Sequence, residues 1–381
     1  MRSRAIKFLL FIGISILLIS YLIWYITSSI ILELKNLSNS PSQACKNELI
    51  KTHDSAGDFK YICCYQDPNH PNDNVGRPFK VEKSMVKFVD LYLNSPGIND
   101  QEKIKYVLDR KPQPITAFSQ NHYSEHIEHI ESALRVFKGQ HIVVYDLGMS
   151  PSQVEYVKRN ESLIYKKFLF KNFPPHVSIL TTYAWKTIIW AQMLRRYHAI
   201  TWFDTSMTWY HTTGQEDFKK VVQKHIMDRN SSILYYGHAI GHSNAWGTNA
   251  RMWGYFPSNM TEHSTFTGNT MKSAKGVILV NTEDFKQNVM KWALSCALVE
   301  DCISPMEVTG KRVTKWCPKE KETEDQGYIC HHFDQSLFSL LAHNYYSYNS
   351  SIYSLGDTDE FLGRPRRVIS RFAKSVEVIE I

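Results

Sequence analysis

The sequence lacks the short motifs that mark several large enzyme classes. It contains no G-x-S-x-G turn for a serine nucleophile, no G-x-x-x-x-G-K-[ST] phosphate loop and no G-x-G-x-x-G dinucleotide fingerprint. It also has no H-E-x-x-H pair of the zinc hydrolases, and no internal repeat or low-complexity block is evident. These absences disfavour kinase, hydrolase and dehydrogenase functions.

The seven cysteines include no C-x-x-C pair, so their spacing fits a structural zinc site poorly. Four of them lie between Cys296 and Cys330, within 35 residues, and the other three lie between Cys45 and Cys64. Disulfide bonds in an oxidising compartment fit this usage better. The group of four permits three connectivities, and the odd total leaves at least one cysteine free or paired between chains.

The first seven residues carry three basic side chains and no acid, and residues 8–26 form an uninterrupted run of apolar and small residues. At a rise of about 1.5 Å per residue this run covers roughly 28 Å, close to the thickness of a hydrocarbon core. We therefore expect a transmembrane signal anchor at residues 8–32, a cytosolic tail at 1–7 and a luminal remainder. A cleaved signal peptide is the alternative, but its apolar region is usually about 7 to 15 residues long.

Glycosylation acceptors and charge agree with a luminal domain. Chance alone would place some Asn-x-Ser/Thr acceptors in a chain of this length, so they support the orientation only modestly. The net charge of +7 is spread along the chain, apart from the anchor flank and a basic tail at residues 361–381. Nucleic acid is not an expected partner in this compartment. The basic tail is expected to be a solvated surface, and binding to an acidic glycan or a nucleotide diphosphate is the alternative. The acceptors are Asn36, Asn160, Asn230, Asn259 and Asn349.

Residues 33–80 are rich in Asn, Ser, Pro and Asp and include the turn-forming string DPNHPNDNVGRP at 67–78. This composition predicts a stalk that merges into loops, with a folded luminal domain over residues 81–360. The domain is long enough to bury a substantial core.

Short β-rich runs alternate with helical patterns beyond residue 80. This order predicts parallel strands joined by crossover helices, so the expected fold class is α/β with a mostly parallel sheet. The expected strands are 115–119, 141–145, 164–170 and 199–203, and the expected helices are 124–137, 151–158 and 183–197.

Polar side chains follow three of the predicted strands. Asn121, Asp146 and Asp204 each lie just beyond a strand end, where parallel α/β sheets bind ligands. The alternative for each is a turn or a helix N-cap. Asp204 is followed two residues later by Ser206, and their oxygens could hold a divalent cation, Mn²⁺ or Mg²⁺, on a diphosphate. Such an ion would neutralise charge on a departing nucleotide diphosphate.

An ordered set of segments extends this hypothesis to a family. Together, over residues 110–345, they resemble a nematode-expanded family of uncharacterised single-pass membrane proteins whose domain of unknown function is similar to GT-A glycosyltransferases. The segments are YDLGMS at 145–150, FLFKNFPPHV at 168–177, YAWKTIIW at 183–190, WFDTS at 202–206 and ICHHFDQSLFSLL at 329–341.

The resemblance implies a GT-A-like (Rossmann-like) fold, a nucleotide-sugar donor, a divalent cation, and a glycan or glycoprotein acceptor in the Golgi or another secretory membrane. Asp204 matches the first acid of the D-x-D signature of such enzymes. Ser206 replaces the second acid, which removes one formal charge from the expected metal site.

Two further positions could carry chemistry. In YAWKTIIW, Trp185 has the spacing of a core residue, whereas Lys186 is expected to point elsewhere and is a candidate phosphate partner. Asp334 precedes an apolar helix and could be a general base on the acceptor hydroxyl, or only a helix N-cap.

Histidines form two patterns without the order of zinc hydrolases. His122, His126 and His129 share one predicted helix face, which we expect to be solvated. His238 and His242 are four residues apart, and His238 follows a β-rich run that could bring it to the same cleft.

Two functions are therefore open. The first is a type II Golgi glycosyltransferase in which Asn121 and Asp146 bind the nucleotide. In it, Asp204 and Ser206 hold the metal and diphosphate, and Asp334 works near the acceptor. The second is a non-catalytic membrane glycoprotein that keeps the fold and binds glycan or protein through aromatic side chains.

Overall fold

The computed structural model describes residues 59–62, 64–71, 75–210, 213–237, 239–264, 270–306, 330–355 and 362–363. The predicted cytosolic tail, the anchor at residues 8–32 and almost all of the basic tail lie outside this part, so those predictions remain predictions. None of the helices in the described part is long and apolar enough to cross a membrane.

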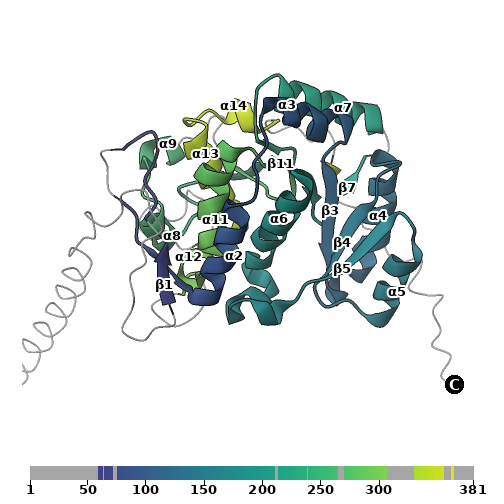
Figure 1. Ribbon diagram of the computed structural model, residues 1–381, viewed down its shortest axis with the longest axis horizontal. Helices are drawn as coiled ribbons and strands as arrows, with labels where there is room; N and C mark the ends of the chain where they lie inside the picture. The colour runs from purple at the N-terminus through teal and green to yellow at the C-terminus, as the bar shows by residue number, and fades with distance from the viewer. Residues whose placement is uncertain are drawn as a thin grey trace, which may run out of the picture. The chain divides into compact units, whose positions relative to one another are not determined.

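A mixed, mostly parallel sheet of six strands organises the domain, in the order β5-β4-β3-β6-β11-β8 (Figure 1). Strands β5, β4, β3 and β6 are parallel, and β11 pairs antiparallel with both β6 and β8. This confirms the predicted α/β class. The strands are β3 Gln113–Phe118, β4 Ile142–Asp146, β5 Leu163–Lys167, β6 Ala199–Phe203, β8 Ile233–Tyr235 and β11 Gly276–Val280.

Helices α4 (Tyr123–Val136), α5 (Pro151–Arg159) and α6 (Ala184–Tyr197) connect the parallel strands, close to the predicted bounds. Helix α5 begins at a capping box between Ser150 and Gln153, with proline at its first position. Only the strand expected at 164–170 is clearly shorter, because its last residues enter a 3₁₀ turn.

The remaining elements surround this framework. The other helices are α2 Lys83–Leu93, α3 Asp100–Lys103, α7 Gln215–Val222, α8 Ala250–Tyr255, α9 Met260–Ser264, α10 Glu283–Phe285, α11 Lys291–Ala297, α12 Glu300–Ile303, α13 Asp334–Tyr345 and α14 Ser350–Tyr353. Within the described residues, two-stranded ribbons pair β1 Phe59–Ile62 with β2 Phe79–Glu82, β9 Ala239–Ser243 with β10 Thr270–Lys272, and β7 Thr208–Trp209 with β12 Leu362–Gly363. Single π turns cover Ile104–Asp109, Gln223–Met227 and Lys286–Met290, and 3₁₀ turns cover Gln120–His122, Phe170–Asn172, Pro175–Ser178 and Leu180–Thr182.

Two hydrophobic cores cover the two faces of the sheet. In β4, Val143 and Tyr145 enter one core and Ile142 and Val144 enter the other, because successive side chains of a strand point to opposite faces. Helices α2, α6, α11 and α13 contribute to the first core, and α4, α5 and α7 to the second. In Figure 1, α6 and α4 lie on opposite sides of β3.

The folded domain begins before residue 80, so the predicted stalk at 33–80 is too long. Strands β1 and β2 form an antiparallel ribbon, and Tyr65 and Phe79 are buried in the first core. The first residues of the polar string at 67–78, which predicted loops, are hydrogen-bonded to residues late in the chain. Asn69 donates to the Asn344 carbonyl (2.6 Å), and the Tyr348 hydroxyl donates to Asp67 (2.8 Å).

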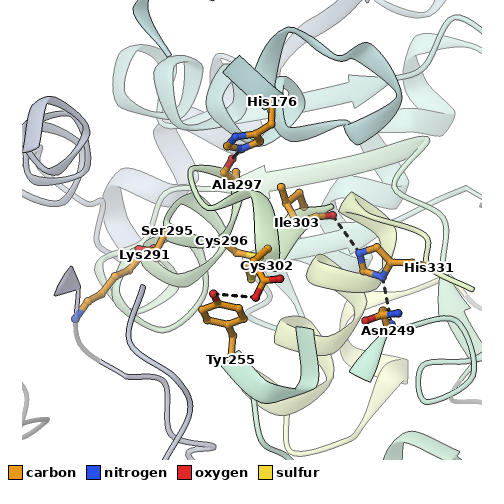
Figure 2. The surroundings of a disulfide bond; sticks show 11 residues. His176, Asn249, Tyr255, Lys291, Ser295, Cys296, Ala297, Cys302, Ile303 and His331 are labelled. Atoms are coloured by element: carbon orange, nitrogen blue, oxygen red, sulfur yellow. Dashed lines mark hydrogen bonds between the residues drawn. A yellow bond between two sulfur atoms is a disulfide. The ribbon is translucent and has the colours of Figure 1, made fainter. Parts of the chain in front are cut away.

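A disulfide joins Cys296 in α11 to Cys302 in α12, which confirms that this cysteine group forms disulfides. Cys64 and Cys330 are disulfide-bonded as well. Figure 2 shows two buried histidines beside the Cys296–Cys302 loop. His176 Nε2 lies 2.9 Å from the Ala297 carbonyl, and His331 Nε2 lies 3.1 Å from that of Ile303.

Candidate functional site

The strand order reverses between β3 and β6. From β3 the chain proceeds outward to β4 and β5, then returns through α6 to β6 on the other side of β3. In open α/β sheets, ligands bind at the carboxyl ends of the strands where the order reverses. Here that position is occupied by residues 119–121 after β3 and residues 204–206 after β6.

Strand β6 and helix α6 bring a carboxylate and an ammonium group together at this position. Trp202 belongs to the core that α6 covers, and Asp204 follows two residues later, so its side chain points the same way. Lys186 Nζ lies 3.0 Å from Asp204 Oδ1. The indole N–H of Trp202 donates to the same oxygen at 2.6 Å.

Helix α13 adds a second carboxylate. Lys186 Nζ donates to Asp334 Oδ2 at 2.8 Å, and one turn along each helix the rings of Trp190 and Phe338 are in contact at 4.7 Å. Lys186 and Asp334 are almost fully buried, with 1% and 3% of their side chains exposed, whereas Asp204 is 19% exposed. The cluster of Lys186, Asp204 and Asp334 therefore opens to solvent at Asp204.

The expectation that Lys186 points away from the core is wrong. Its ammonium group contacts Asp204, Asp334 and the Ala274 carbonyl (3.3 Å), so three partners match its three donors. Burial lowers the pKa of Lys186, but the two carboxylates outweigh burial and hold that pKa above its ordinary value. Lys186 thus stays charged and offers no donor to a phosphate.

Asp204 and Ser206 form a minimal donor set for a divalent cation. Oδ1 of Asp204 already accepts two donors, and no donor from the described residues reaches Oδ2. Ser206 is half-buried in a turn closed by the Met207 N–H on the Asp204 carbonyl (3.0 Å). The described residues hold no group of three or more His, Cys, Asp or Glu in a metal-binding arrangement.

Mg²⁺ and Mn²⁺ can nevertheless be held by one or two protein oxygens when water and phosphate oxygens complete the shell. One ammonium against two carboxylates leaves the cluster with one negative charge, which favours a cation. The residues present therefore fit a divalent ion that arrives with a diphosphate.

The Asp146 carboxylate accepts hydrogen bonds from the backbone of the loop after β4. Its Oδ1 accepts the N–H groups of Gly148 (2.8 Å) and Met149 (2.7 Å), and its Oδ2 accepts the Tyr165 hydroxyl (2.7 Å). Burial raises the pKa of the Asp146 carboxyl, but these three hydrogen bonds outweigh burial and lower that pKa below its ordinary value. The structure favours the turn interpretation of this residue over nucleotide binding.

Asn121 remains accessible at the end of β3. It is exposed in the 3₁₀ turn Gln120–His122, and its Oδ1 accepts the Ser119 hydroxyl at 2.5 Å. The Gln120 N–H bonds the Gly148 carbonyl at 2.9 Å, which ties this turn to the loop after β4.

One of the predicted surface histidines is buried. His129 Nε2 lies 2.9 Å from Thr116 Oγ1, and Nδ1 lies 2.6 Å from the Met207 carbonyl, so the ring supports the turn after Asp204 from beneath. The expectation of a solvated face is wrong for this residue, because α4 packs it against the sheet. His238 and the side chains of His122 and His126 lie outside the described residues.

The sequence did not single out Tyr183, Trp202 or Phe333, which surround the cluster. The i, i+2 relation of Trp202 to Asp204 was a visible signal that both face the same side of the sheet. Tyr183 and Phe333 have positive φ angles, and nothing in their residue type signals that conformation.

Comparison with protein families identifies one segment. Residues 51–191 match the model of a protein of unknown function, DUF1647. The match includes β3, β4, β5 and the start of α6 with Lys186, and it ends before Asp204. Comparison with curated protein sequences gives no match.

Solved structures similar to this chain include glycosyltransferases. The galactosyltransferase LgtC, in complex with donor and acceptor sugar analogues, is 10% identical over 47% of this chain and 60% of LgtC, with a TM-score of 0.27. The mannosyltransferase Ktr4p from S. cerevisiae, in complex with GDP, is 7% identical over 55% of this chain and 68% of Ktr4p, with a TM-score of 0.32. Core-mannan synthase A from Aspergillus fumigatus, in its Mn/GDP form, is 9% identical over 50% and 64%, with a TM-score of 0.30. TM-scores this low do not by themselves transfer a function.

Proposed function

We propose that this chain is a type II membrane glycosyltransferase of the Golgi or another secretory-pathway membrane. It transfers a sugar from a nucleotide-sugar donor to a glycan or glycoprotein. The observation that carries this proposal is Asp204, which stands where the strand order reverses, with one oxygen fixed by Lys186 and the other open. A fixed carboxylate at this position suits a metal-bound diphosphate.

In this proposal each residue has a defined task. Asp204 and Ser206 would hold Mn²⁺ or Mg²⁺ together with the diphosphate, and such an ion would supply positive charge to stabilise the departing nucleotide. Asn121 lies at the end of the neighbouring strand and is open to the nucleotide. Lys186 orients Asp204. Asp334 positions Lys186 from within the core, and its burial favours this structural role over the general-base role that the sequence left open.

Ligand-dependent thermal stability of the detergent-solubilised full chain tests the proposal. A panel of UDP, GDP and their sugar conjugates is added with Mn²⁺, because a ligand that binds only the folded state stabilises it by about 2.7 kcal/mol at 100 times its Kd. We expect at least one nucleotide sugar to raise the Tm only when Mn²⁺ is present. Asp204→Asn should abolish the shift, whereas Asp109→Asn, at an exposed position, should retain it. The absence of a shift with every member of the panel would contradict the proposal.

The absence of a second acid supports the other candidate, a non-catalytic glycan-binding membrane protein. Ser206 supplies a hydroxyl where D-x-D enzymes supply a carboxylate, and Lys186 already occupies Oδ1 of Asp204. That function predicts glycan binding that is unaffected by nucleotide, by Mn²⁺ and by Asp204→Asn.

A further inference from the structure

Two aromatic residues beside the buried cluster have unfavourable backbone conformations. Tyr183 precedes α6 with φ 55° and ψ 9°, and Phe333 precedes α13 with φ 50° and ψ −112°. These are the two helices that carry Lys186 and Asp334. Positive φ is unfavourable for bulky residues, and such conformations in proteins cluster at ligand-binding and active sites.

Phe333 stands at a position that normally requires glycine. The Gln335 N–H bonds the His332 carbonyl at 3.0 Å and closes a four-residue turn with Phe333 in its second place. The angles of Phe333 are those of a type II′ turn, in which the second residue is usually Gly. Glycine would adopt this turn without strain. The presence of an aromatic residue at this position therefore has to be explained by the contacts that its ring makes.

The two rings are neighbours, and the Tyr183 ring also lies near the Lys186 ammonium group. The ring centroids of Tyr183 and Phe333 are 6.1 Å apart, and Lys186 Nζ lies 5.5 Å from the Tyr183 centroid. Phe333 is buried, whereas Tyr183 is only half-buried. Tyr183 is thus the more exposed of the two aromatic residues, and part of its surface is open to solvent.

We infer that Tyr183 is a stacking platform for a pyranose ring, with Phe333 as its support; this inference rests on the proposed glycosyltransferase function. A pyranose has a C–H face that packs on an aromatic ring, while its hydroxyls bond to polar groups at its rim. Asp204 provides such a group, because Lys186 contacts both the Tyr183 ring and the Asp204 carboxylate. The same chemistry suits the sugar of the donor or of the acceptor.

Substitutions at Tyr183 separate the ring from the backbone conformation. Asn tolerates positive φ and lacks the ring, so Tyr183→Asn removes the platform without adding strain. Tyr183→Phe keeps the ring. His198 ends the same helix with φ 62° and its ring packs on Tyr106 at 4.5 Å, so His198→Asn is a matched control at the opposite end of α6.

Calorimetric titration of the solubilised full chain measures the affinity for UDP, UDP-glucose, UDP-galactose, UDP-N-acetylglucosamine, GDP and GDP-mannose in Mn²⁺. A printed glycan array measures acceptor binding. For Tyr183→Asn we expect unchanged affinity for the nucleotide alone and an at least tenfold loss of the part of the affinity that the sugar adds. Tyr183→Phe and His198→Asn should behave like the wild type. Urea unfolding of each variant verifies that it is folded.

The outcomes distinguish the sources of the sugar and the two proposals. Loss confined to nucleotide sugars assigns the platform to the donor, and loss confined to the array assigns it to the acceptor. If the wild type binds a nucleotide sugar and the folded Tyr183→Asn variant keeps both affinities, the platform is overturned while the proposed function stands. If the wild type binds neither nucleotide sugar nor glycan, both proposals fail.

Discussion

At the scale of single residues, Lys186 is the group on which the site depends. Its ammonium is the only cation within contact of Asp204 and Asp334 among the described residues, and two of the three members of the cluster, Lys186 and Asp334, are buried. Removing one member of a buried ion pair destabilises a protein by about 3 to 5 kcal/mol, because the remaining charge is uncompensated. We expect Lys186→Met to lower the free energy of unfolding in urea by an amount in this range.

Two further variants make that measurement specific. Lys171→Met removes an exposed lysine from a 3₁₀ turn and should change the free energy of unfolding by less than about 0.5 kcal/mol. Asp334→Asn in the Lys186→Met background removes the buried negative charge that has lost its cation. This second substitution should restore part of the lost free energy of unfolding. A loss below about 1 kcal/mol for Lys186→Met would show that the cluster does not hold this part of the fold.

The sequence allowed Lys186, Asp204 and Asp334 to be selected as candidate site residues. It did not predict that these side chains contact one another. Asp204 was predicted from its place after a strand, and Asp334 from its place before a helix. Their common partner depends on how α6 packs against α13, which is a tertiary contact between segments far apart in the chain. Only the packed structure shows that one lysine serves both.

At the scale of elements, periodicity predicted the parallel strands and their connecting helices well, and it failed where burial is uniform. Helix α6 is buried on nearly all sides, from Ala184 to Leu194. A helix without a polar face gives no periodic signal for the direction of any one side chain. This is why Trp185 was placed correctly and Lys186 was not.

Helices α9 and α13 meet through two buried histidines, which should make stability depend on pH. His263 Nε2 bonds Asn344 Oδ1 at 2.8 Å, and the His263 and His343 rings are 4.9 Å apart. Burial, and then the neighbouring His343, lowers the pKa of His263 to about 3, and burial lowers that of His343 to about 4. Both values lie below the unfolded value of about 6.5, so only the unfolded chain takes up these protons as the pH falls below 6.5.

The stability due to the neutral histidines is therefore complete above about pH 6.5 and declines as the pH falls toward about 4. Each histidine contributes up to about 1.4 kcal/mol per pH unit within that window. Urea unfolding at pH 7 and pH 5 should show a smaller decline for His263→Gln than for the wild type. His141→Gln, at an exposed histidine, should leave the decline unchanged. Equal declines for His263→Gln and the wild type would contradict the assignment.

At the scale of the whole molecule, the local sequence pattern predicted the α/β class. It could not predict which strands pair when they lie far apart in the chain. The antiparallel insertion of β11 between β6 and β8 joins segments that share no local signal. The early start of the domain was missed for a related reason: Tyr65 lies beside a polar, turn-forming string, and it is buried by Phe256 and Trp292 from much later in the chain.

Orientation across the membrane is predicted from the N-terminal run, and the described domain offers an independent test of it. Among the glycosylation acceptors, Asn349 is exposed, and its Oδ1 accepts the Ser351 N–H (3.1 Å) and hydroxyl (2.7 Å). Those bonds use the oxygen and leave the amide nitrogen, where a glycan is attached. A luminal domain should therefore carry an N-linked glycan at Asn349.

Synthesis of the full chain in the presence of sealed microsomes checks this, with peptide N-glycosidase treatment before electrophoresis. We expect the enzyme to increase mobility, and Asn349→Gln and Ser351→Ala each to remove one glycan from the untreated chain. Ser351→Thr preserves the acceptor and should match the wild type. If the untreated and treated chains migrate alike, the domain has not entered the lumen, and the proposed topology and compartment fail together.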